Sequence, residues 1–161
     1  MEEPMFFVRK LVIAVGCLMM LIGGVYAQSS WLKGSTEDQL KTLGDLQPGL
    51  GTVMIEYSYR YATAYYAAKA GNWGLADYQL KEMREIQEVG ETTRPARAGA
   101  LKGFETAFLD PLGKAIEAKD FKKFQAAFNA ATEGCNGCHV SQGFAFIKYE
   151  LPKAAPSPLK P

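Results

Sequence analysis

The sequence predicts an all-α protein whose helices form an antiparallel four-helix bundle over residues 48–150. Apolar residues recur at spacings of three and four along several long segments, as they do on one face of an amphipathic helix. No segment shows the alternation of apolar and polar residues, bounded by turn residues, that is typical of a half-buried strand. The connectors between the periodic segments are short, which favours neighbouring helices that run antiparallel.

The amino-terminal segment has the pattern of an export signal. Arg9 and Lys10 precede the uncharged apolar run LVIAVGCLMMLIGGVYA, which ends in a small-residue cleavage site at Ala27. We therefore expect residues 1–27 to be a signal peptide that is removed on export. A run of about 17 apolar residues also reaches the short limit for a membrane anchor, so a retained leader is the alternative. Lipidation at Cys17 is a weaker alternative.

Short flanking segments are predicted on either side of the bundle. Residues 28–47 form a lead-in, with a short helix whose N-cap is Ser35. Residues 151–161 are rich in proline, which favours an extended tail rather than a further helix.

Two long helices are predicted at the start of the bundle. Pro48 and Gly49 open the first, because proline is tolerated in the first helical turn, where its missing N–H costs nothing. Gly71 suits the left-handed residue that often follows a helix. The side chain of Asn72 can cap the second helix, which we expect to end at Gly90.

Two further helices complete the predicted bundle. The third follows Pro95 and should be kinked or interrupted at Asp110-Pro111. It carries apolar residues at helical spacing, namely Leu101, Phe104, Phe108, Leu112 and Ile116. The fourth is capped by Asp120, bears a phenylalanine stripe and runs into the sequence CNGCH.

Charge and composition exclude some classes of partner. The chain has 18 Lys and Arg against 17 Asp and Glu, a formal net charge of +1. Because no basic stripe is present, nucleic-acid binding is not expected. Loss of residues 1–27 would leave a chain without a membrane segment, whose cysteines are Cys135 and Cys138 and whose methionines are Met54 and Met83.

The sequence CNGCH brings Cys135 and Cys138 next to His139, the only histidine of the chain. A redox dithiol is expected at the start of a helix that follows a strand, where the thiol pKa is lowered, and this context is missing. A structural zinc site needs four ligands, and the mature chain offers two cysteines and one histidine. A disulfide would leave the histidine unexplained.

Covalent attachment of haem c needs only the residues that are present. C-x-x-C-H is the attachment signature, in which both thiols bond to the haem and the histidine ligates its iron. On a helix Cys135, Cys138 and His139 share a face, because they lie at positions i, i+3 and i+4. Phe128 and Thr132 lie on that face one to two turns earlier, and we expect them to wall the pocket. Export fits as well, since c-type haem is attached outside the bacterial cytoplasm, so we expect a periplasmic protein.

A signal peptide, four helices and a single CNGCH late in the last helix together resemble class II c-type cytochromes, the cytochrome c′ group and its low-spin relatives. The resemblance covers the architecture of about residues 35–150. It implies one haem c attached to Cys135 and Cys138, with His139 as the proximal iron ligand, and a homodimer formed through the first two helices. The chain differs from many members after the motif, where it reads HVSQGFAFIK instead of placing an aromatic and then a basic residue at short spacing.

The second axial position of the iron separates two functions. Met54 lies early in the first long helix, where relatives place the residue facing the distal side of the haem. A thioether ligand there would give an electron carrier that works with periplasmic redox proteins. Without that bond the protein would bind a diatomic gas, NO or CO. Met83, mid-way along the second helix, is the other candidate for the thioether ligand, but filling the core is its expected role.

The tyrosine-rich first helix adds a further candidate to this position. Most of its phenol rings are expected to pack in the core or to reach water. Tyr57 or Tyr61, on the same stripe as Met54, could instead donate a hydrogen bond to a bound ligand or ligate the iron. An enzyme is not expected, because the sequence offers no distal histidine, no acid–base pair and no second metal cluster.

Overall fold

The computed structural model describes residues 31–156, so the predicted signal peptide, Cys17 and the end of the proline-rich tail lie outside the described residues. The chain divides into two compact units between Gln47 and Pro48. In the first unit, α2 spans Thr36–Asp45. The hydroxyl of Ser35 accepts from the Asp38 N–H at 3.2 Å, and the Asp38 carboxylate accepts from the Ser35 N–H at 2.9 Å. This reciprocal capping box confirms the predicted N-cap.

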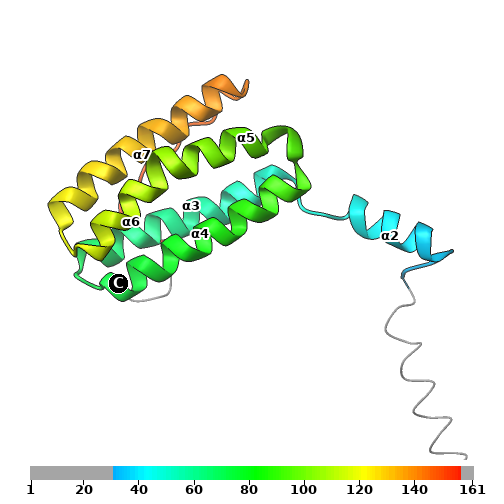
Figure 1. The fold of residues 1–161 in the computed structure, drawn as a ribbon, viewed down its shortest axis with the longest axis horizontal. Helices are drawn as coiled ribbons and strands as arrows, with labels where there is room; N and C mark the ends of the chain where they lie inside the picture. Colours follow the sequence, from blue (N-terminus) through cyan, green and yellow to red (C-terminus); the bar gives the residue numbers. More distant parts are fainter. Residues whose placement is uncertain (1–30, 157–161) are drawn as a thin grey trace, which may run out of the picture. The chain divides into compact units, whose positions relative to one another are not determined.

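The second unit is helical throughout its described core (Figure 1). Its elements are α3 (Leu50–Lys69), α4 (Trp73–Thr93), α5 (Pro95–Phe104), the π-helical turn η1 (Glu105–Leu109), α6 (Asp110–Glu117) and α7 (Phe121–Ser141). Residues 31–156 contain no β-strand, so the predicted all-α class is confirmed. Within the same range, no helix combines the length and the apolar character needed to cross a membrane.

A tight turn joins α3 to α4 and makes them neighbours that run in opposite directions. Gly71 adopts φ +80°, the left-handed conformation that a glycine reaches without steric cost. The N–H of Asn72 then donates to the Ala67 carbonyl at 2.9 Å, and its side chain accepts from the Leu75 N–H at 3.1 Å. Both the predicted stop of the first helix and the predicted cap of the second are confirmed.

The prediction that the second helix ends at Gly90 is wrong, because α4 continues to Thr93. Gly90 is buried inside the helix, where α3 approaches closely. A Cβ atom at this position would lie 3.0 Å from the Leu50 side chain and 3.3 Å from that of Val53. The glycine therefore serves close helix packing and not helix termination.

The third predicted helix is interrupted, as expected, by a widened turn. The N–H of Asp110 donates to the Glu105 carbonyl five residues earlier, which defines the π-helical turn η1. Pro111 follows at once and has no N–H to continue the usual ladder. Arg84 of α4 pairs with the carboxylates of Glu105 and Asp110, and so ties this turn to its neighbour.

Aromatic side chains of α3 and α7 fill the centre of the unit. Asp120 caps α7 as predicted, accepting from the Lys123 N–H at 3.1 Å. Phe124 and Phe128 are buried, and the ring of Tyr61 stacks on Phe128 with centroids 4.1 Å apart. This packing fixes the face that α7 turns toward α3, and with it the direction of the CNGCH residues two turns later.

Candidate functional site

A cavity of about 470 Å³ lies between α3, α5, the end of α7 and the segment that follows α7. Its volume falls in the range of roughly 300–1,000 Å³ that is usual for ligand and cofactor pockets. Its lining includes six residues that the sequence analysis singled out, namely Met54, Tyr57, Tyr61, Cys135, Cys138 and His139. The fold thus brings the CNGCH motif and the distal candidates of the first long helix to one cavity.

Both cysteines of the motif carry free thiols and are half-buried in the last turns of α7. Burial raises the pKa of the Cys135 thiol to about 12. A reactive redox dithiol needs the opposite shift, toward the thiolate. The surroundings of Cys135 therefore disfavour dithiol–disulfide exchange as the role of this pair.

His139 has a defined ring orientation. Its Nδ1 atom lies 3.0 Å from the carbonyl oxygen of Ile147. A carbonyl oxygen can only accept, so Nδ1 must carry the proton of this hydrogen bond. In the neutral imidazole the lone pair then belongs to Nε2, which makes Nε2 the nitrogen able to ligate a metal.

Met54 and Met83 lie in different surroundings. Met54 is half-buried and lines the cavity together with His139. Met83 is fully buried in the core of the unit and does not line the cavity. Of these two, only Met54 therefore offers a thioether to the same cavity as the imidazole.

The two candidate tyrosines also differ in their hydrogen bonds. The hydroxyl of Tyr61 donates to the Phe128 carbonyl at 2.6 Å and lies 3.1 Å from the Thr132 hydroxyl. The hydroxyl of Tyr57 is buried and has no partner within the protein. Burial raises the pKa of the Tyr57 phenol well above its usual range, so this group stays protonated and can donate.

Phe128 and Thr132 do not line the cavity, where the sequence analysis expected them. Both residues lie behind Tyr61. The Phe128 ring stacks on the Tyr61 ring, and the Tyr61 hydroxyl hydrogen-bonds the Phe128 carbonyl and the Thr132 hydroxyl. Helical periodicity placed them on the correct side of α7. The large Tyr61 side chain, however, fills the space between them and the cavity.

The cavity residues that sequence reasoning missed include Arg97, Lys148 and Gln87. Arg97 and Lys148 supply positive charge to the lining. Arg97 lies at the start of α5, hydrogen-bonds Gln142 and stands 5.6 Å above the ring of Phe144. Gln87 of α4 presents a buried Oε1 atom without a partner. No periodic pattern marks these residues, since each reaches the cavity from a different element.

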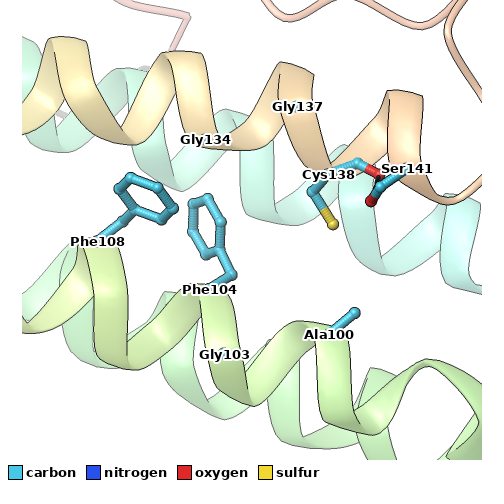
Figure 2. A pocket seen from close by; sticks show the side chains of 8 residues that line it. All are labelled: Ala100, Gly103, Phe104, Phe108, Gly134, Gly137, Cys138 and Ser141. Carbon is cyan, nitrogen blue, oxygen red and sulfur yellow. Dashed lines mark hydrogen bonds between the residues drawn. The ribbon is translucent and has the colours of Figure 1, made fainter.

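A second, open space of about 400 Å³ lies between α5 and α7 (Figure 2). It shares Ala100, Phe104 and Cys138 with the first cavity. The sulfur of Cys138 points into the gap between the two helices. Gly103 and Gly137 border this gap, and a Cβ atom on either would meet no atom within 4 Å. The protein therefore leaves room beside Cys138 for a group larger than the cysteine itself.

In the described part of the chain, no three His, Cys, Asp or Glu side chains are grouped so that they could hold a bare metal ion. No protein-family model, no curated protein and no solved structure matches this chain.

Proposed function

We propose that this chain is an exported c-type cytochrome that carries one haem c and transfers single electrons to and from periplasmic redox proteins. Cys135 and Cys138 would form the two thioether links, and His139 would ligate the iron. The observation that carries the proposal is the convergence of both thiols, the only imidazole and the Met54 thioether on one cavity. When bound, the haem supplies the iron that changes oxidation state.

The residues around the cavity fit this cofactor. Its walls are largely apolar and aromatic, and open space continues beside Cys138. Arg97 and Lys148 bring positive charge to the lining, which suits the two carboxylates of a haem. The apolar walls would exclude water from the iron, and Nε2 of His139 is free to bind it.

The proposal includes the arrangement of a class II c-type cytochrome, an antiparallel four-helix bundle with the haem near the C-terminal end of the last helix. Its members would be α3, α4, the interrupted stretch from α5 to α6, and α7. Support comes from the contacts of α3 with α4 and α7, and of the α5–α6 stretch with both α4 and α7.

Substitution of Met54 tests whether the haem is six-coordinate. We expect Met54→Leu, which keeps volume but removes the sulfur, to convert low-spin iron to high spin, lower its reduction potential and open it to carbon monoxide. The direction follows because a methionine ligand raises the potential of haem iron. Optical spectra of the oxidised and reduced protein measure the spin state, and a redox titration measures the potential.

Met83→Leu makes the same chemical change outside the cavity and serves as the control, with an unchanged spectrum expected. A low-spin wild type whose spectrum does not respond to Met54→Leu would contradict ligation by Met54. A wild type that is already high spin would instead make Met54 a steric cover of the distal side.

The unpartnered hydroxyl of Tyr57 favours a second candidate function, reversible binding of a diatomic gas to five-coordinate iron. A buried donor without a partner costs free energy that a hydrogen bond to a bound ligand would recover. Tyr61 cannot serve in this way, because its hydroxyl is already engaged with Phe128 and Thr132.

Tyr57→Phe is expected to weaken carbon monoxide binding by about two- to tenfold, the equivalent of one hydrogen bond. It should also raise the infrared stretching frequency of the bound gas, because the donor that polarises it is gone. Tyr61→Phe is the matched control and should leave that frequency unchanged. Equal frequencies in wild type and Tyr57→Phe would contradict a role for the Tyr57 hydroxyl.

A further inference from the structure

The chain reverses direction directly after the CNGCH motif. Gly143 adopts φ +87°, a left-handed conformation, and its N–H donates to the Val140 carbonyl at 3.1 Å. The Phe144 N–H donates to the carbonyl of His139 at 2.7 Å. These bonds end α7 and turn the following residues back toward the motif. We refer to residues 143–149 as the return segment.

Hydrogen bonds to its backbone and the ring of Tyr149 hold the return segment in place. Its side chains are exposed from Gly143 to Lys148, whereas Tyr149 packs against the core with its ring centroid 5.2 Å from that of Tyr61. At the far end of the return segment, the backbone of Tyr149 makes two hydrogen bonds with the side chain of Asn136. The Asn136 Oδ1 accepts from the Tyr149 N–H at 2.8 Å, and the Asn136 Nδ2 donates to the Tyr149 carbonyl at 3.2 Å. The side-chain amide thus pairs with the backbone of Tyr149 as a neighbouring strand would.

The return segment contacts His139 between these two attachments. The Ile147 carbonyl, two residues before Tyr149, accepts the hydrogen bond from Nδ1 of His139. The Ile147 N–H is in turn bonded to the Phe144 carbonyl at 2.8 Å. The carbonyl that orients the imidazole is therefore fixed on one side by the turn at Gly143 and on the other by Tyr149, which Asn136 and the contact with the Tyr61 ring hold.

We infer that the return segment positions His139, and that Asn136, one of the two residues between the cysteines, is the positioning residue that anchors it. This inference rests on the proposed function, because it concerns how the imidazole is presented to an iron. A hydrogen bond from the far nitrogen of a ligating imidazole fixes the ring and raises the basicity of the ligand. A more basic ligand stabilises ferric over ferrous iron, so the segment should hold the reduction potential down.

The test uses the holoprotein, produced in a periplasm that contains the haem-maturation machinery. Asn136→Ala removes both bonds to Tyr149, while Asn129→Ala makes the same change at an exposed position two turns earlier on α7. We expect Asn136→Ala to shift the ferrous–ferric equilibrium about tenfold toward ferrous iron, a rise of about 59 mV for one electron. In the Met54→Leu background, which frees the sixth position, the iron–histidine stretching band of the reduced protein should move to lower frequency on Asn136→Ala. Asn129→Ala should change neither quantity.

Asn136→Asp provides a milder variant, because its carboxylate still accepts from the Tyr149 N–H but cannot donate to the carbonyl. Its potential is expected between those of wild type and Asn136→Ala, and it keeps the test decisive where the alanine variant fails to fold. Potentials and stretching bands equal to those of the parent proteins in the folded variants would overturn the inference. Intact mass separates this outcome from failure of the proposed function, which a wild-type chain without covalent haem would show.

Discussion

Replacing Cys135 and Cys138 together by alanine is expected to abolish covalent haem binding. Each thiol lines the proposed haem cavity, and no other cysteine remains in the mature chain expected from the sequence. The single variants should retain at most one thioether link and load haem unstably. Intact mass after denaturation measures covalent attachment directly, because haem held only by its iron ligand is extracted by acid and acetone.

Val140→Ala is a suitable control, since Val140 directly follows the motif and its side chain is 61% exposed. It should carry the same amount of covalent haem as the wild type, one per chain. A wild-type protein that is colourless and holds one equivalent of zinc would contradict haem attachment altogether. Such a result would make the motif part of a zinc site, although the chain offers fewer ligands than such a site usually has.

Features governed by local chemistry were predictable from the sequence. The caps at Ser35, Asn72 and Asp120 follow from short side chains that accept hydrogen bonds from the first free N–H groups of a helix. The turn at Gly71 depends on one residue with a positive φ. Gly90 looked the same in the sequence, but its role is set by Leu50 and Val53, which are distant in the sequence and lie on α3. Sequence pattern alone does not distinguish a terminating glycine from one that permits close packing.

The candidate site was likewise predictable from the sequence only in part. The common face of the cysteines and His139 follows from helical spacing, whereas the choice of Met54 is what the resemblance to class II c-type cytochromes implies. The difference in hydrogen bonding between Tyr57 and Tyr61 could not be predicted from the sequence, because it depends on a backbone carbonyl of α7. The pairing of Asn136 with the return segment spans a turn whose geometry no periodicity encodes.

Removal of the proposed haem is expected to destabilise the whole helical unit. The cavity is bordered by α3, α5 and α7, and the helices that enclose it also share the aromatic core around Phe124 and Phe128. A haem that bridges these helices would add apolar contacts that only the folded unit can make.

The same wild-type polypeptide, produced with and without the haem-maturation machinery, provides the cleanest comparison. The haem-free form should melt at a much lower temperature or lose its cooperative transition, because a group bound only by the folded state stabilises that state. It should keep far-ultraviolet helical dichroism, lose near-ultraviolet aromatic dichroism and bind a hydrophobic dye, as a loosely packed helical state does. The double cysteine variant should behave like the haem-free wild type. Superimposable melting curves for the two wild-type forms would show that the helices pack without the cofactor, and that the cavity is preformed instead of being completed by haem.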